Sequence, residues 1–209
     1  MSKSLNAENT REALLEEAKK LFCENGFDGT SVRDICQSAD VNVSSIKYHF
    51  GDKAGLYREC FKEYGISRLS STNKILTKAK STIEFRSMMI HFCHDFIEAN
   101  IEKMHILKLI TREIESENPM IEDIFQETLL KIFTNFANVI EDGKKSGLLK
   151  SNVDPIILAS AFFHTLTMNL KLDHIGKKHF QRTLKNKEYR EHFINNLVAI
   201  FFDGITIEE

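Results

Sequence analysis

The 209-residue sequence contains no tryptophan, only two prolines and only nine glycines. Glycine and proline mark turns, so their scarcity leaves little material for the many turns of an all-β fold and favours long helices. The sequence also lacks an excess of charge, because 28 Lys+Arg face 30 Asp+Glu for a net charge of -2. Proteins that bind nucleic acid through bulk electrostatics usually carry a basic excess, so any DNA contact in this chain would have to be local.

Long apolar runs and paired cysteines are missing as well. The stretch 156–167 is apolar but is interrupted by Ser160 and His164, and it is far shorter than the ~20 residues that cross a bilayer. The four cysteines form no C-x-x-C pair, and no signal peptide is recognisable before them. We therefore expect a cytoplasmic protein with reduced thiols and no membrane partner.

The sequence does contain a succession of helical patterns, in which apolar residues recur three and four positions apart. Ser81 with Glu84 forms a capping box, and Asn118-Pro119 and Asp154-Pro155 each place a cap before a proline at the first helical position. These signals predict about nine helices, near residues 7–24, 30–39, 42–49, 53–75, 81–97, 103–116, 119–143, 155–172 and 186–202.

The fold class that we predict is therefore all-α. A three-helix, helix-turn-helix DNA-binding domain would occupy residues 1–53, and the fourth helix would connect it to the rest of the chain. Residues 54–209 would form a helical effector-binding and dimerisation domain. Of the 16 phenylalanines, 12 follow residue 65, which agrees with a large apolar body in this part.

The segment from Gly26 to Tyr57 carries the most specific signal. It reads GFDGTSVRDICQSADVNVSSIKYHFGDKAGLY, in which two short helices are joined by a turn of about four residues, the layout of a helix-turn-helix DNA reader. Over residues 8–60 the sequence resembles the TetR (tetracycline-repressor) family. It has a glycine-aromatic start, Thr-Ser before the second helix, an Ala-x-Val turn, and a recognition helix that ends in Tyr-His-Phe before Asp-Lys. The resemblance implies a ligand-controlled repressor that binds a palindromic operator as a homodimer.

A recognition helix must present small or polar side chains to base edges and keep one apolar edge for its own core. We expect Ile46 and Phe50 to form that apolar edge, and Lys47 to reach a phosphate or a guanine. Lys53 falls in the first turn of the fourth helix, where the helix dipole favours an anion. These positions also match residues that contact DNA in the family. The predicted DNA-binding residues are Thr30, Ser31, Arg33, Asn42, Val43, Ser44, Ser45, Lys47, Tyr48, His49 and Lys53.

The match to the family pattern has three departures. Asp40 stands where the family has a turn glycine, Ser44 where it has a small residue or glycine, and Lys47 where it has tyrosine. Residues 1–65 also carry 9 Lys+Arg against 11 Asp+Glu, so binding would depend on cations gathered on one side. Two alternatives stay open: the aromatic end of the helix is ordinary core packing, or the chain is a helical sensor or interaction protein that keeps the scaffold without binding DNA.

The rest of the chain carries two further sets of candidates. An effector pocket for a small hydrophobic or amphipathic molecule would be lined by Met88, Phe92, Phe96, Leu109, Ile110, Arg112, Phe125, Leu129 and Phe133. By resemblance, the last two helices would pair with those of a second subunit through Leu158, Phe162, Thr165, Leu166, Asn169, Phe193, Leu197, Ile200 and Phe201. For each apolar residue in these sets the alternative is ordinary core packing. Arg112 could hold an acidic ligand, or it could form a salt bridge with Glu115 or with a neighbouring helix.

Clusters that would support metal binding or catalysis are missing from the sequence. His91 and His94 share a helical face, but two ligands fall short of the four that a structural zinc site needs. No Ser-His-Asp constellation, phosphate-binding glycine loop or H-E-x-x-H occurs. We therefore predict no metal, no cofactor and no enzymatic activity; an enzyme would need a reactive residue such as His94 or His164 in the pocket.

Gly65 lies inside the predicted fourth helix, where glycine costs ~1 kcal/mol relative to alanine. It could make the helix compliant, or it could mark a place where a neighbouring helix packs closely. The fourth helix begins at the phosphate contact that we expect at Lys53, so a tilt of this helix could carry an effector signal to the recognition helices.

Overall fold

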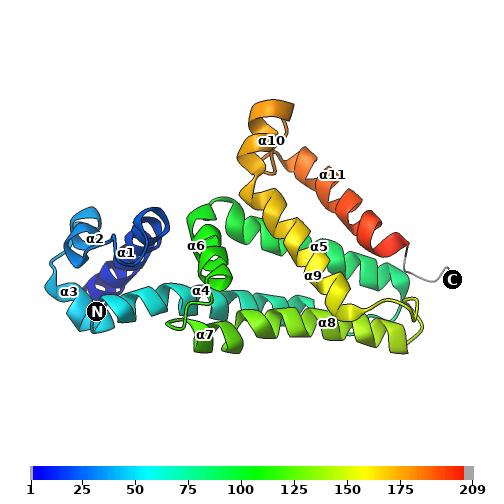
Figure 1. Cartoon of the computed structure of the whole chain (residues 1–209), viewed down its shortest axis with the longest axis horizontal. Helices are drawn as coiled ribbons and strands as arrows, with labels where there is room; N and C mark the ends of the chain where they lie inside the picture. The colour runs from blue at the N-terminus through cyan, green and yellow to red at the C-terminus, as the bar shows by residue number, and fades with distance from the viewer. Residues whose placement is uncertain (1, 205–209) are drawn as a thin grey trace. The chain divides into compact units, whose positions relative to one another are not determined.

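The computed structural model describes residues 2–204, and their side chains from residue 7 on. The regular structure of these residues consists of helices joined by short loops (Figure 1), which confirms the all-α prediction. The helices are α1 (Ser2–Asn25), α2 (Val32–Ser38), α3 (Ser44–Phe50), α4 (Lys53–Ile75), α5 (Thr82–Ile101), α6 (Met104–Glu115), α7 (Glu122–Glu127), α8 (Leu129–Lys145), α9 (Pro155–Lys171), α10 (Asp173–Phe180) and α11 (Lys187–Val198), followed by a π-helical turn at Ala199–Asp203.

The chain forms two compact units, which we call unit 1 and unit 2. Unit 1 comprises Met1–Ser67 and His105–Thr128, and unit 2 comprises Arg68–Met104 and Leu129–Glu209. The division does not follow the boundary that we expected between residues 53 and 54. The first part of α4 and the later helices α6 and α7 belong with the N-terminal helices, so the functional boundary at residue 53 stays a prediction.

In unit 1, α1 packs against both α2 and α3. Residues of α1 and α4 that recur at helical spacing face one another in the core, and α2 and α3 add a few apolar side chains each. The core includes Leu14, Leu15, Ala18, Phe22, Ile35, Ile46, Leu56, Tyr57 and Phe61. Tyr57 is packed within this core, where its ring makes edge contacts with both Phe22 and Phe61 at 4.9 Å between ring centroids.

Unit 2 has a core that is rich in phenylalanine. Here α9 lies against α5 and α8, and α11 lies against α5. The rings of Phe85, Phe92, Phe136, Phe162 and Phe202 are almost fully buried. Phe136 stacks on Phe162 with 5.1 Å between the ring centroids, and Phe92 lies 5.2 Å from Phe136. These five phenylalanines therefore form the centre of the core of unit 2.

The predicted helix starts at Ser31, Ser81, Asp154 and Asn186 are confirmed. In each case the side-chain oxygen accepts a hydrogen bond from a backbone N–H in the first turn. Two predictions were wrong. The expected helix 119–143 is broken at Thr128 into α7 and α8, and Asn118 makes a turn with the Met120 N–H instead of capping a helix. The helix α10 was not expected at all.

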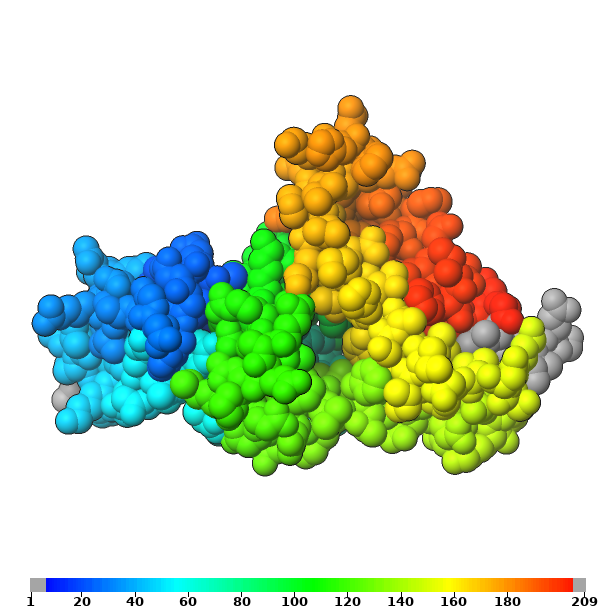
Figure 2. Space-filling model, in the orientation of Figure 1, coloured from blue at the N-terminus to red at the C-terminus, as the bar shows by residue number. Residues whose placement is uncertain are grey.

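The helix α10 has no buried residue, and in Figure 2 its orange surface projects from the body of unit 2. Its first turn is tied to the following loop, because Asp173 accepts hydrogen bonds from the Thr183 hydroxyl and the Leu184 N–H. Sequence periodicity cannot identify such a helix, because it buries no apolar stripe. Within residues 2–204, no helix is both long and apolar enough to span a membrane.

Candidate nucleic-acid interface

The start of α2 and the turn between α2 and α3 both follow from neighbouring residues in the sequence. Ser31 caps α2 in a complete capping box, in which its hydroxyl accepts from the Asp34 N–H and the Asp34 carboxylate accepts from the Ser31 N–H. After α2, Asp40 adopts a left-handed conformation with φ of 52°. This is the position where the family has glycine. Asp40 therefore does the work of that glycine, at some conformational cost.

The recognition helix α3 is held at its start by Asn42. The side-chain oxygen of Asn42 accepts from the Ser44 N–H at 2.9 Å and from the Ser44 hydroxyl at 2.8 Å. Ile46 is the one fully buried residue of the helix, and Phe50 is half-buried, as expected of the apolar edge. On the other side, Tyr48 is 79% exposed and Val43 47% exposed. Large side chains on this face are thus presented to solvent.

Three cations were expected beside α3, and they differ in their exposure and in their partners. Arg33 and Lys47 are exposed and have no ion-pair partner among the described residues. Lys53 is half-buried: its Nζ donates to the Thr30 carbonyl at 2.8 Å and lies 4.3 Å from the centroid of the Phe27 ring. A lysine ammonium has three N–H groups, so Lys53 keeps donors for a phosphate while it ties α4 to the start of α2.

Thr30 has a different role from the one that we expected. Its side chain is 1% exposed, and its hydroxyl donates to the carbonyls of Leu21 and Gly26. The hydroxyl therefore fastens the end of α1 to the start of α2, and it is not presented to DNA. Ser45 and His49 are half-buried and lie at the margin of the exposed face, where they were expected.

Each of the three guanidinium nitrogens of Arg112 makes a hydrogen bond within unit 1. Its two Nη atoms donate to the carbonyls of Phe22 and Cys23 at 2.9 and 3.1 Å, and its Nε donates to Glu113 at 2.9 Å. The last carbonyls of a helix have no partner within the helix, and basic side chains commonly satisfy them. Arg112 therefore caps the C-terminus of α1. These hydrogen bonds join Arg112 to a neighbouring helix, and a ligand role for Arg112 stays a prediction.

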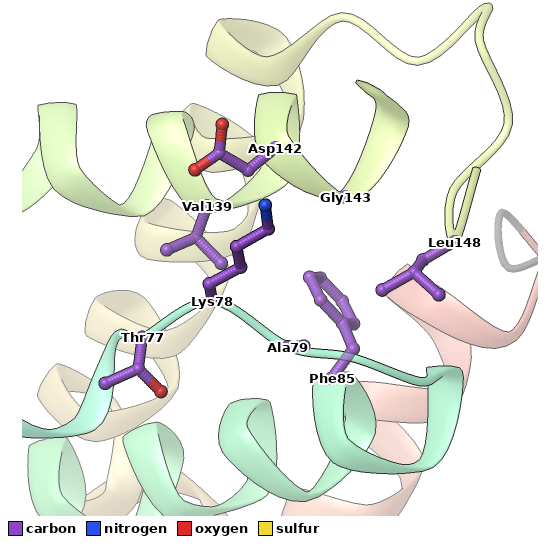
Figure 3. Close-up of a pocket in the computed structure, with 8 residues that line it drawn as sticks. All are labelled: Thr77, Lys78, Ala79, Phe85, Val139, Asp142, Gly143 and Leu148. Carbon is purple, nitrogen blue, oxygen red and sulfur yellow. The ribbon is translucent and has the colours of Figure 1, made fainter. Parts of the chain in front are cut away.

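The predicted effector residues are divided between the units. Leu109, Ile110, Arg112 and Phe125 belong to unit 1, and the remaining five belong to unit 2. A pocket in unit 2, with a volume of about 10 Å³, has room for about one water molecule (Figure 3). None of the predicted residues lines it. Its walls are Thr77, Lys78, Ala79, Phe85, Val139, Asp142, Gly143 and Leu148.

The predicted dimer residues are likewise mixed. Phe162, Leu166 and Leu197 are buried in the core of unit 2, so the alternative of ordinary core packing applies to them. Leu158, Thr165, Phe193 and Phe201 are half-buried, and Asn169 and Ile200 are exposed. Other exposed residues on these helices, which were not predicted, are Ile157, Ala161 and His164 of α9 and His192 and Asn196 of α11.

The candidate metal ligands do not come together. Among the described residues no group of three or more His, Cys, Asp or Glu side chains is placed to hold a metal ion. His94 pairs with Glu191 at 3.1 Å, and His91 is exposed. Cys36, Cys60 and Cys93 are buried and Cys23 is half-buried, and all four thiols are free.

Comparison with known proteins agrees with this geometry. Residues 14–60 match the family model described as "Bacterial regulatory proteins, tetR family". Over 139 residues, the chain is 32% identical to the probable HTH-type transcriptional regulator YttP of Bacillus subtilis, a match that spans 66% of each chain. The chain belongs to the TetR family. It is therefore a DNA-binding transcriptional regulator, as the helix-turn-helix predicted.

Other TetR-type regulators extend the likeness along the chain. The HTH-type transcriptional repressor DhaR of a Mycobacterium species is 26% identical over 154 residues, which cover 71% of this chain and 74% of DhaR. The fold resembles that of the ketosteroid regulator KstR2 of Mycobacterium tuberculosis, with a TM-score of 0.69 at 19% identity over 95% of both chains. A TetR-family regulator of Marinobacter aquaeolei gives a TM-score of 0.70 at 18% identity over the whole of both chains.

Proposed function

We propose that this TetR-family regulator is a homodimeric repressor that binds a palindromic operator through α3 and releases it when a small apolar effector binds. The observation that carries the proposal is the exposed face of α3. Tyr48 and Val43 are solvent-exposed there although they are large and apolar in part, and Lys47 is exposed beside them without an ionic partner. Exposed side chains of this kind on a short helix suit the major groove.

The DNA contact would combine two kinds of interaction. Val43, Ser44 and Tyr48 would reach base edges, with Asn42, Ser45 and His49 beside them, and the exposed Lys47 would reach a phosphate at the edge of the groove. Arg33, Lys53 and the exposed hydroxyl of Ser31 would hold phosphates. Since residues 1–65 have more acidic than basic residues, these few cations would carry most of the salt dependence.

A second copy of the chain would cover the exposed side of α9 and α11. Ile157 is 70% exposed and Ile200 76% exposed, and Ala161 and His164 continue the exposed stripe on α9. An exposed apolar stripe on α9, with the exposed Ile200 just after α11, is suited to a helical bundle with a symmetry mate. Two-fold symmetry would also present two copies of α3 to two half-sites of a palindrome.

An effector would enter unit 2 at the edge of the phenylalanine core. Phe96, Phe133 and Phe163 come from α5, α8 and α9 and are only half-buried, although each ring touches another ring of the core. Half-exposed rings on three helices can part to admit an apolar molecule. Phe96 and Phe133 belong to the predicted pocket, whereas Phe163 was not identified from the sequence. Repression is proposed because the relative DhaR is named a repressor.

The test is fluorescence anisotropy of the purified protein with labelled DNA from upstream of its own coding region, read against a scrambled duplex of equal length. We expect saturable binding at two subunits per duplex, and affinity that falls with salt. Lys47→Ala should weaken the binding, while Lys131→Ala, which removes an exposed lysine of α8 in unit 2, should not. Equal affinity for the scrambled duplex would contradict operator recognition, and a stoichiometry of one would contradict the dimer.

A further inference from the structure

The recognition helix has few anchors of its own. It is seven residues long, and Ile46 is its one buried residue. A helix of two turns is marginal without tertiary contacts, so its direction depends on the few side chains that hold its ends. Asn42 holds the start. The end is held at Phe50, the last residue of the helix.

Arg11 of α1 lies over Phe50. Its guanidinium carbon is 5.6 Å from the centroid of the Phe50 ring, within the range of a cation–π contact. The same guanidinium donates to the Glu59 carboxylate of α4 at 2.5 Å. Both side chains of this ion pair are about one-third exposed. Arg11 thereby joins α1 and α4 to the end of α3, and the planar guanidinium can make both contacts at once.

A row of rings leads from Phe50 to the DNA-facing side of α3. The Phe50 ring lies 5.9 Å from the His49 ring, and the His49 ring lies 4.8 Å from the Tyr48 ring at nearly a right angle. Tyr48 at the end of this row is the most exposed large residue of the helix. The placement of Tyr48 therefore depends on contacts that begin at Arg11.

From these contacts we propose that Arg11 is a positioning residue for operator binding, which acts through Phe50 and does not contact DNA. This rests on the proposed contact of α3 with the operator. The charge of Arg11 is already neutralised by Glu59, so it displaces few counterions from DNA. Its effect is on the orientation of α3, and hence on affinity rather than on the salt dependence of affinity.

The experiment measures operator affinity at several salt concentrations for the full-length wild type, Arg11→Gln, Arg11→Lys, Phe50→Leu and the double variant Arg11→Gln/Phe50→Leu. We expect Arg11→Gln to weaken binding about threefold to tenfold, the scale of a half-exposed cation–π contact with an ion pair, at an unchanged salt slope. Arg11→Lys should recover part of the loss, because it keeps the charge for Glu59. The double variant should bind no more weakly than Phe50→Leu.

Several results would overturn the proposal. A salt slope flattened by about one unit per subunit in Arg11→Gln would make Arg11 a phosphate contact, as expected for the comparison variant Lys47→Ala. Losses that multiply in the double variant would show that Arg11 does not act through Phe50. Unchanged operator affinity in Arg11→Gln and in Glu59→Gln would leave Arg11 a purely structural residue. A wild type that binds no operator would instead defeat the proposed function itself.

Discussion

Gly65 of α4 lies against Thr128, so closely that a Cβ atom at position 65 would be 2.7 Å from the Thr128 Cβ. Thr128 is buried, and its hydroxyl donates to the Ile124 carbonyl at the point where α7 ends. Of the two roles that the sequence left open for Gly65, this contact supports close packing. The absence of a side chain at position 65 lets α4 approach the junction between α7 and α8.

Gly65→Ala should therefore destabilise the protein, although alanine is the better helix former by ~1 kcal/mol. Overpacking against a buried residue costs typically ~1–3 kcal/mol, so after the gain in helix propensity the net loss of unfolding free energy should be up to about 2 kcal/mol. Urea unfolding followed by circular dichroism measures it. Combining Gly65→Ala with Thr128→Gly, which removes the clashing side chain, should reduce the penalty for the added methyl group. If Gly65→Ala instead increased the free energy of unfolding, Thr128 would have moved to make room for the added methyl group at little cost.

Asp40→Gly should stabilise the turn before α3. Asp40 has φ of 52°, and a left-handed conformation costs an L-residue with a side chain roughly 1 kcal/mol, somewhat less for aspartate. Glycine adopts this conformation freely. We expect a gain of about 0.5–1 kcal/mol in the free energy of unfolding, measured by urea titration, whereas Asp40→Ala should lose stability. Equal shifts of the urea midpoint of unfolding in Asp40→Gly and Asp40→Ala would contradict a conformational cost at position 40.

Lys47 and Lys53 should be separable by their effect on stability. Each should flatten the salt slope of operator binding by about one unit per subunit when changed to alanine, because each would release counterions from one phosphate. Only Lys53→Ala should also lower the unfolding midpoint, because Lys53 ties the Thr30 carbonyl and the Phe27 ring to α4. Anisotropy in a salt series and urea unfolding give the two quantities. An unchanged slope in both variants would contradict the assignment of these lysines to phosphates.

The four thiols should differ in reactivity. Burial raises the pKa of Cys60 and of Cys93 to about 12. At pH 8 only about one part in 10⁴ of such a thiol is ionised, and the thiolate is the reactive form. Burial raises the pKa of Cys23 too, but this residue is half-buried and more accessible. With Ellman's reagent at pH 8, we expect one thiol to react in the native protein and the others on unfolding; Cys23→Ser should abolish the native reaction.

Glu113 should make unit 1 sensitive to acid. Burial alone would raise the pKa of its carboxyl, but hydrogen bonds from Asn118 and Arg112 outweigh burial and hold the pKa below the ordinary value of 4.5. The folded state therefore gains stability from Glu113 at neutral pH, and loses it as the pH falls through the lowered pKa. Glu113→Gln should cost about 1–3 kcal/mol at pH 7 and less near pH 4, as measured by urea unfolding. A stability loss in Glu113→Gln that did not change with pH would contradict a stabilising role for the ionised Glu113 carboxylate.

Local signals in the sequence predicted the helix-turn-helix well. The caps at Ser31 and Asp154 and the reversal at Asp40 depend on neighbouring residues, so a short stretch of sequence contains the whole interaction. The exposed and buried sides of α3 also followed from spacing, because Ile46 is the apolar residue that the module must bury.

Contacts between distant residues could not be predicted in the same way. Thr128, where the helix breaks, contacts Gly65 of a distant helix, and the role of Arg112 depends on carbonyls of α1 that any sequence would offer. The dimer prediction shows a related limit. Periodicity identified an apolar stripe on α9, but Phe162 and Ile157 are both apolar, and only the packing of α5 and α8 decides which of them is covered.

The assembly of unit 1 from two separate stretches of chain has a consequence for synthesis on the ribosome. The helices α1 to α3 emerge first, but Arg112, which satisfies the last carbonyls of α1, follows much later. Nascent chains fold as units once all parts of a unit are available. Unit 1, which contains the recognition helix α3, can thus be completed only after α5, which belongs to the other unit, has been made and α6 has left the exit tunnel.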